Sequence, residues 1–273
     1  MRIIDCFPYN GEAIALFRLR YLWDVVHEFV IVEAGETHTG LKKGSLFLDT
    51  NAAQLKQFAG KITRLVIERF PAPSEADLAP LINLQRKTDP KAWFREKYQR
   101  NFAGDYLRGR GEPWILLGCD VDEIPRRETV ETLPKRYDAL TVGYRLQMEL
   151  FYYSSRWIKR DKWLHAFVAN DRAVRHESLD GLRTGRSIKK ALGDAGWHLS
   201  YFMSNDEIQR KLQAFAHTEL SSPESRRLEW IQQCRRTGQD LHHRGPQEDC
   251  IPYAGDDLPE GLRAFEALSG IGE

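Results

Sequence analysis

Residues 114–125 read WILLGCDVDEIP, an apolar run that ends in three acids. The short, continuous apolar run predicts a buried strand of a sheet that is covered on both faces. Ligands of open α/β sheets bind beyond the carboxyl ends of the strands, which is where Asp120, Asp122 and Glu123 fall. The stretch therefore predicts a buried sheet. It also predicts a ligand-binding site at the edge of that sheet where the strands end.

On both sides of this stretch, apolar runs and amphipathic segments alternate, which is typical of β-α-β units. Further strands are predicted at residues 2–7, 29–33 and 61–67, and helices at 12–24, 52–58, 93–107 and 126–136. The segment 139–163 is aromatic and rich in β-forming residues, and the charged segment 206–235 is predicted to be helical. We expect an α/β fold with a mostly parallel central sheet.

The composition is that of a soluble globular protein, with 42% hydrophobic and 29% charged residues in a chain of 273. The length predicts one large domain, which we place at residues 1–235, and a C-terminal extension at 236–273 that packs on it or is rich in loops. The 40 basic and 39 acidic residues balance to a net charge of +1. That balance argues against a dedicated nucleic-acid binder.

No stretch approaches the ~20 apolar residues of a membrane helix. The first residues, which include Asp5 and Glu12, do not form a signal peptide. We therefore expect a cytoplasmic protein and leave peripheral attachment to a membrane open. The four cysteines lack a C-x-x-C pair, so neither a zinc site nor a redox motif is predicted, and we expect Cys6 and Cys119 to be buried.

The alternate acids Asp120 and Asp122 could reach one hard cation, Mn²⁺ or Mg²⁺, which would neutralise charge on a leaving phosphate. They could also be solvated acids at a strand end, but the buried strand before them favours a metal. A neutral imidazole makes His198 a possible third ligand, although a core histidine bonded to the backbone would look the same. The neighbours His242 and His243 point apart, so we expect an exposed loop there.

Six stretches resemble, in order, those of glycosyltransferase family 17, whose eukaryotic members include the bisecting β-1,4-mannosyl-glycoprotein N-acetylglucosaminyltransferase. The stretches are Phe7-Pro-Tyr-Asn-Gly-Glu12, Asp24-Val-Val-His-Glu-Phe-Val-Ile-Val-Glu33, Thr37-His-Thr-Gly40, Arg95-Glu96 with Gln99-Arg-Asn101, Asp120-Val-Asp-Glu-Ile-Pro125 and Ala195-Gly-Trp-His198. Together they extend over most of residues 1–220. Each stretch alone is unspecific, whereas the ordered set is hard to produce by chance.

The resemblance implies a GT-A-like, Rossmann-like transferase of nucleotide-diphospho-sugars that inverts the anomeric carbon. It implies a UDP-sugar donor, with GlcNAc as the expected sugar, a glycan acceptor and Mn²⁺ or Mg²⁺ as cofactor. Asp120 and Asp122 would hold the metal and the sugar nucleotide. Asn10, Glu12 and Glu33, at the ends of the first two strands, would line the nucleotide pocket.

Chemistry and position suggest two further roles, with His198 as a third metal ligand and Arg100 at the diphosphate, because the guanidinium fork matches phosphate oxygens. Inversion also requires a base that takes the proton of the acceptor hydroxyl on the face away from the metal. The candidates for this base are Glu149 and Glu219, each of which could instead be a salt-bridged surface acid.

Two other functions stay open at this stage. A metal-dependent nucleotidyl or phosphoryl transferase would also need paired acids, but the sequence has no Walker-type phosphate loop. A non-catalytic module could bind a sugar nucleotide without turning it over. The aromatic residues 151–153 could stack on a sugar or pack in the core.

Overall fold

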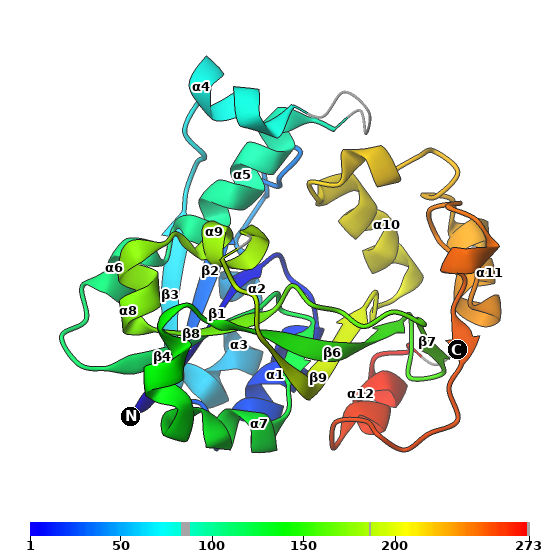
Figure 1. Ribbon diagram of the computed structural model, residues 1–273. Helices are drawn as coiled ribbons and strands as arrows, with labels where there is room; N and C mark the ends of the chain where they lie inside the picture. Colours follow the sequence, from blue (N-terminus) through cyan, green and yellow to red (C-terminus); the bar gives the residue numbers. More distant parts are fainter. Residues whose placement is uncertain (83–87, 186, 272–273) are drawn as a thin grey trace.

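The structure is a computed structural model that describes residues 1–82, 88–185 and 187–271. A mixed sheet crosses the molecule, and its main strand order is β10-β7-β6-β8-β4-β1-β2-β3. Helices cover both faces of this sheet (Figure 1). None of the helices in the described part of the chain has the length and apolar character needed to span a bilayer.

The elements have the following bounds. The strands are β1 (Arg2–Tyr9), β2 (Glu28–Ala34), β3 (Ile62–Ile67), β4 (Trp114–Gly118), β5 (Glu123–Pro125), β6 (Tyr144–Tyr152), β7 (Trp157–Ile158), β8 (Phe167–Asn170), β9 (Ala191–Ser200) and β10 (Ile251–Pro252). The α-helices are α1 (Ile14–Leu22), α2 (Phe47–Thr50), α3 (Ala52–Leu55), α4 (Glu75–Leu78), α5 (Pro90–Asn101), α6 (Gly104–Arg108), α7 (Arg127–Thr132), α8 (Asp171–His176), α9 (Leu179–Thr184), α10 (Asn205–Ala214), α11 (Leu228–Thr237) and α12 (Leu262–Leu268). The 3-10 helices are η1 (Lys56–Lys61), η2 (Ala79–Leu81), η3 (Leu133–Thr141), η4 (Thr218–Leu220) and η5 (Pro246–Glu248).

The amino-terminal half of the sheet is parallel. Strand β1 pairs with β2 on one side and β4 on the other, and β3 joins the far edge of β2. Successive residues of β1 enter two different cores, since Ile3 and Phe7 face one side of the sheet and Ile4 and Cys6 the other. Burial on both faces explains why these strands are continuous apolar runs, and it confirms the predicted α/β class with a parallel central sheet.

The central strands have the predicted parallel arrangement, and the second half of the sheet is mixed. Strand β8 runs antiparallel to both β4 and β6, and β9 pairs antiparallel with β5 but parallel with β6. The physical reason lies partly in the connections. Antiparallel neighbours such as β6 and β7 can be joined by a short turn, whereas parallel neighbours need a long crossover.

The predicted helix over 206–235 is interrupted. Its two parts, α10 and α11, are separated by residues 215–227, which include Pro223, and Pro is disfavoured in a helix interior. Both helices pack on a third apolar cluster around Tyr153, Tyr201, Ile208 and Ile231. The interruption places a loop of the chain beside the sheet edge where the acids lie.

The C-terminal segment packs on the rest of the chain. Strand β10 pairs with β7 in the main sheet. In α12, the ring of Phe265 lies 5.5 Å from that of Phe17 in α1. Elsewhere in the chain, Cys6 and Cys119 are buried, as predicted.

Candidate functional site

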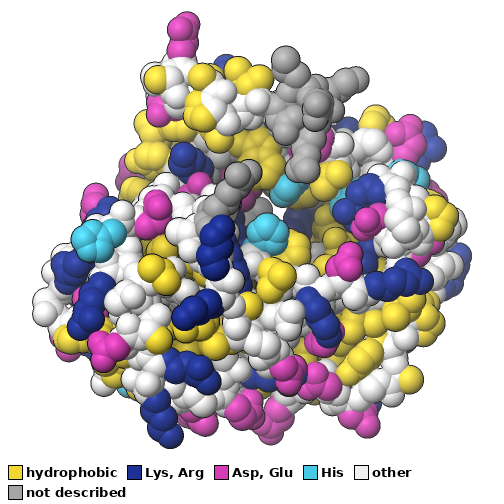
Figure 2. All heavy atoms as spheres, viewed as in Figure 1, with side chains coloured by type: hydrophobic (Ala, Val, Ile, Leu, Met, Phe, Trp, Pro, Cys, Tyr) yellow, Lys and Arg dark blue, Asp and Glu magenta, His cyan; other side chains and the backbone are white. Residues whose placement is uncertain are grey.

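A cleft of about 350 Å³ opens beyond the carboxyl ends of β1 and β4. One wall carries residues that follow these strands, together with α5, and the other carries α10 and residues of the C-terminal half. Figure 2 shows this face of the molecule hollowed between the two walls. The residues that matter most here are Asn10, Glu12, Arg100, Asp122, Lys211 and His242. Position and residue types agree with the site predicted from the sequence.

A larger hollow, of about 660 Å³, lies elsewhere, beside Arg126 and Trp197. It lies away from the carboxyl ends of β1 and β4, where ligands of open α/β sheets bind. Its Arg126 is already paired with Asp194 and Asp257, each at 2.5 Å. We therefore place the functional site in the cleft beyond β1 and β4.

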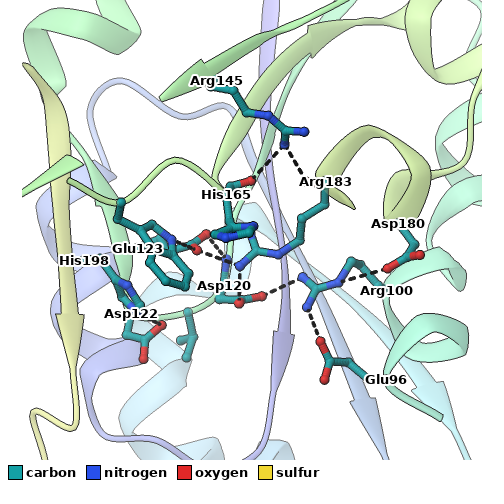
Figure 3. Close-up of polar contacts among 12 residues, drawn as sticks. Glu96, Arg100, Asp120, Asp122, Glu123, Arg145, His165, Asp180, Arg183 and His198 are labelled. Carbon is teal, nitrogen blue, oxygen red and sulfur yellow. Dashed lines mark hydrogen bonds and ion pairs between the residues drawn. The ribbon is translucent and has the colours of Figure 1, made fainter. Parts of the chain in front are cut away.

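Asp120 is held by two arginines. Its Oδ1 lies 2.6 Å from Nη1 of Arg100 and its Oδ2 lies 2.5 Å from Nη2 of Arg183 (Figure 3). Burial alone would raise the pKa of Asp120, but the two guanidinium groups hold it well below its usual range. Asp120 is therefore ionised, with both oxygens engaged.

Asp122 faces a different pair of groups. Its Oδ2 lies 3.0 Å from Nζ of Lys211, and its Oδ1 lies 3.4 Å from Nε2 of His198. Burial would raise the pKa of Asp122, but Lys211 and then His198 hold it far below its usual range. The two aspartates both line the cleft, yet they point to separate partners.

The backbone of the acidic loop is fixed by buried charges. Glu123 accepts hydrogen bonds from the guanidinium of Arg183 at 2.7 and 2.9 Å and from the backbone N–H of Asp120 at 2.6 Å. Behind it, Arg18 donates to the carbonyl oxygens of Asp120, at 3.2 Å, and of Glu123. Arg18 is in turn held by Asp5, at 2.5 and 2.7 Å, with neither side chain exposed.

The structure places two of the three predicted nucleotide-pocket residues in the cleft. Asn10 and Glu12 line it, and the Glu12 carboxylate accepts the N–H of Asn10 at 2.8 Å. Burial raises the pKa of Glu12, and Lys211 opposes that rise. Glu33 is fully buried and accepts the N–H groups of Phe47 and Leu48, at 2.7 and 2.9 Å, at the start of α2. Glu33 does not line the cleft as the described residues form it.

The two candidate bases also lie outside the cleft lining that the described residues make. Glu149 on β6 is paired with Lys162, and Glu219 lies 3.0 Å from Nδ1 of His217. The acids that line the described cleft all belong to the amino-terminal half, namely Glu12, Glu36, Glu96, Asp120 and Asp122. The opposite wall presents mainly aromatic and histidine side chains, together with Lys211 and Arg244.

A divalent cation is compatible with part of the predicted ligand set. Asp122 and His198 offer a carboxylate oxygen and an imidazole nitrogen, both buried, and Nδ1 of His198 has no hydrogen-bond partner among the described residues. In residues 1–82, 88–185 and 187–271, no group of three His, Cys, Asp or Glu side chains is spaced to hold a metal. Mg²⁺ usually keeps waters and takes substrate phosphates as further ligands, so two protein ligands fit such an ion.

The sequence did not predict several residues that line the cleft or hold its acids in place. Arg183 and Lys211 lie on helices without a motif that marks them. His242 was expected in an exposed loop, and this was wrong, because it is half-buried and lines the cleft. Its neighbour His243 is exposed. Adjacent side chains diverge, and that divergence sends one histidine inward and the other outward.

The comparisons with known proteins give one family. The sequence model of Glycosyltransferase family 17 matches residues 1–252. No curated protein matches this chain in sequence. Similar solved structures include TarS from S. aureus, with a TM-score of 0.37 and 11% identity over 78% of this chain and 65% of that one. Another is the galactosyltransferase LgtC in complex with donor and acceptor sugar analogues, with a TM-score of 0.36 and 14% identity over 99% of this chain and 95% of that one.

Proposed function

This chain belongs to glycosyltransferase family 17, and we propose that it transfers GlcNAc from UDP-GlcNAc to a hydroxyl group of a glycan, with inversion. We further propose that the reaction depends on Mn²⁺ or Mg²⁺. The observation that carries this proposal is the meeting of Asp122 and His198, 3.4 Å apart, at the cleft beyond the carboxyl ends of β1 and β4.

The charges of the cleft suit a nucleoside diphosphate. A divalent ion on Asp122 and His198 would supply positive charge to the leaving diphosphate. Lys211 lies 3.0 Å from Asp122, so its ammonium can meet a phosphate oxygen beside the same acid. Arg100, held on the floor of the cleft by Asp120 and Glu96, would meet the diphosphate from the side of α5.

The nucleoside would lie near the end of β1. Asn10 and Glu12 line the cleft there, and Glu12 is oriented by the N–H of Asn10. Since burial raises the pKa of Glu12 and Lys211 lowers it, displacement of the ammonium towards phosphate would favour the protonated acid. A protonated Glu12 could donate to a ribose or base oxygen as well as accept.

The test is the release of UDP from UDP-GlcNAc with and without Mn²⁺. We expect Mn²⁺-dependent release by the native chain and a loss of at least about 100-fold in Asp122→Ala, the scale of removing a group that stabilises transition-state charge. Asp105→Ala, at an exposed acid that pairs with Arg108 on the surface, is the matched control. Equal release by Asp122→Ala would refute the metal assignment, and release of GlcNAc-1-phosphate in place of UDP would instead support nucleotidyl transfer.

A further inference from the structure

The wall of the cleft opposite the acids contains a tyrosine, Tyr201, that is hydrogen-bonded to a histidine, His242. Nζ of Lys211 lies 3.0 Å from Asp122 and 5.3 Å from the centroid of the Tyr201 ring, so Tyr201 and the acid lie near the same ammonium. The Tyr201 hydroxyl is 3.1 Å from Nε2 of His242. Both side chains line the cleft.

The surroundings of His242 fix its tautomer. Its Nδ1 lies 2.9 Å from the carbonyl oxygen of Leu220, the last residue of η4. A carbonyl oxygen can only accept, so Nδ1 carries the proton and donates it. In the neutral ring, Nε2 is then left with a lone pair, and the Tyr201 hydroxyl donates to it.

The loop that carries His242 is itself held in place. The buried carboxylate of Asp240 accepts the backbone N–H of His242 at 3.2 Å and that of Arg244 at 2.9 Å. It also accepts the Arg244 guanidinium at 2.6 Å. Asp240 is therefore a positioning residue that sets the loop and, through it, the direction of the imidazole.

The backbone of Tyr201 adds a second sign of a specialised position. Its φ is 60°, in the left-handed region that a bulky side chain rarely adopts. Such conformations cost about 1 kcal/mol or more and persist where the surrounding packing enforces them, often at functional sites. Tyr201 is held by the third apolar cluster, between Tyr152 and Tyr153.

We propose that His242, acting through the hydroxyl of Tyr201, is the general base that removes the proton of the acceptor hydroxyl. This inference rests on the proposed inverting transfer and names the base that the reaction requires. It leaves the proposed metal and donor contacts of Asp122, His198 and Lys211 as they are. The carboxylates expected for this role, Glu149 and Glu219, are paired elsewhere and lie outside the lining of the described cleft.

The step balances as a single displacement. The acceptor oxygen forms a bond to the anomeric carbon while the bond from that carbon to the diphosphate oxygen breaks, and UDP leaves with the electron pair. The acceptor proton passes to Oη of Tyr201, whose own proton passes to Nε2 of His242. The resulting imidazolium loses its proton to water after the products leave.

The electrostatic surroundings keep His242 neutral before the reaction. Burial lowers the pKa of His242 to about 4, Arg244 and His217 also lower it, and Asp240 together with the Leu220 carbonyl opposes them. At neutral pH the lone pair on Nε2 is therefore available. Its basicity is close to that of the carboxylates that ordinarily serve in glycosyl chemistry.

The decisive experiment compares water with azide as the nucleophile in UDP release from UDP-GlcNAc. Water must lose a proton, whereas azide has none to lose, so only the first reaction needs the base. We expect His242→Ala to lose UDP release with water by about 10²–10⁴-fold, the usual contribution of a general base. Azide should restore release and yield the glycosyl azide of inverted configuration. His243→Ala, at the exposed neighbour, should behave as the native chain.

Binding of UDP, measured by calorimetry, shows that the variant is folded. If His242→Ala no longer binds UDP, the same comparison of water with azide is made in Tyr201→Phe. This variant keeps the ring and removes only the hydroxyl that passes the proton to His242. Native release rates in His242→Ala, or a loss that azide does not restore in a variant that binds UDP, would overturn the base while leaving the proposed function intact. Absence of UDP release by the native chain from every UDP-sugar would overturn both.

Discussion

Lys211 is the residue whose charge most directly adjusts the site, since its ammonium lies 3.0 Å from Asp122 and neutralises it. Burial would lower the pKa of Lys211, but Asp122 and Glu12 raise it, so it stays charged. We expect Lys211→Met to weaken UDP binding without metal and to tighten Mn²⁺ binding, each at least several-fold, because two unit charges about 4 Å apart interact by about 1 kcal/mol even in bulk water.

Calorimetric titration with UDP and with Mn²⁺ separately measures both effects. Lys91→Met, which removes the same charge at an exposed position at the start of α5, is the control. Unchanged affinities for both ligands in Lys211→Met would show that the ammonium faces neither of them.

Arg18 gives a prediction about stability. Its ion pair with Asp5 is fully buried, so Arg18→Met leaves a carboxylate unpaired in the core and should cost about 3–5 kcal/mol in the free energy of unfolding. Arg64→Met breaks an exposed pair with Asp49 and should cost only about 0–1 kcal/mol. Urea unfolding of the two variants checks the contrast, and equal losses would contradict it.

At the residue scale, the sequence predicted positions at strand ends better than directions of side chains. Asn10, Glu12 and Asp122 follow β1 and β4, and the sheet edge brings them together as expected. Glu33 also ends a strand, but its side chain turns to the N–H groups of α2. Glu149 was a candidate base in the sequence, and nothing in a linear pattern could show its pairing with Lys162.

At the scale of elements, α10 matters because it carries Lys211 into the cleft. The helix begins with a capping box in which Ser204 and Glu207 satisfy each other's backbone N–H groups. Ser204→Ala should cost about 1 kcal/mol of unfolding free energy, and it should weaken UDP binding because the start of α10 loosens.

The chain provides a matched control for this variant. Ser74 forms the same capping box, with Asp77, at the start of α4, whose residues do not line the described cleft. Ser74→Ala should therefore leave UDP affinity as it is. If both variants weakened UDP binding equally, the helix start would not be what transmits the effect.

Strands and helices could be predicted from the sequence where burial alone determines the pattern of apolar residues. The strands β1, β2 and β4 lie between two apolar layers, so their apolar runs are unambiguous. The break between α10 and α11 was not foreseen, although Pro223 lies within it, because the charged segments on either side both have a helical pattern. The antiparallel position of β8 between β4 and β6 was not predicted, because strand neighbours that are distant in sequence depend on long-range pairing.

For the molecule as a whole, the buried acids set the response to pH. The pKa values of Asp120 and Asp122 are held below their usual range despite burial, by arginines and by Lys211 with His198 respectively. A depressed pKa in the folded state stabilises the fold fully above about pH 4, the unfolded value, and this stability is lost as the pH falls further.

We therefore expect the urea midpoint to fall steeply between about pH 4 and pH 2, where the unfolded chain binds more protons than the folded one. Asp122→Asn, which cannot be ionised, should make that decline shallower. Asp105→Asn, at an acid on the surface, should not change it. A decline with the same slope in Asp122→Asn and the native chain would show that this ion pair adds nothing to acid sensitivity.

The C-terminal segment has two separate roles, since one part of it lines the cleft and the other packs on the rest of the chain. Residues up to 252 supply His242 and Arg244 to the cleft, whereas α12 packs on α1 and its Glu266 accepts hydrogen bonds from Ser155. A chain ending at residue 252 should melt several degrees lower yet bind UDP with native affinity. A chain ending at residue 235 should lose stability and also the part of the second wall formed by His242 and Arg244. Thermal unfolding with and without UDP distinguishes these outcomes.

The two walls of the cleft come from different stretches of the chain. The acids follow the parallel strands of the first 125 residues, and Tyr201 and His242 come from the last third. Changes confined to the loop that carries His242 can thus alter which molecule receives the sugar, whereas changes at His198 or Lys211, on the same later stretch, would also disturb how the activated sugar is held. A hybrid that keeps His198 and Lys211 with the first stretch and takes the loop of His242 from a relative would inherit its nucleotide preference from one parent and its recipient from the other.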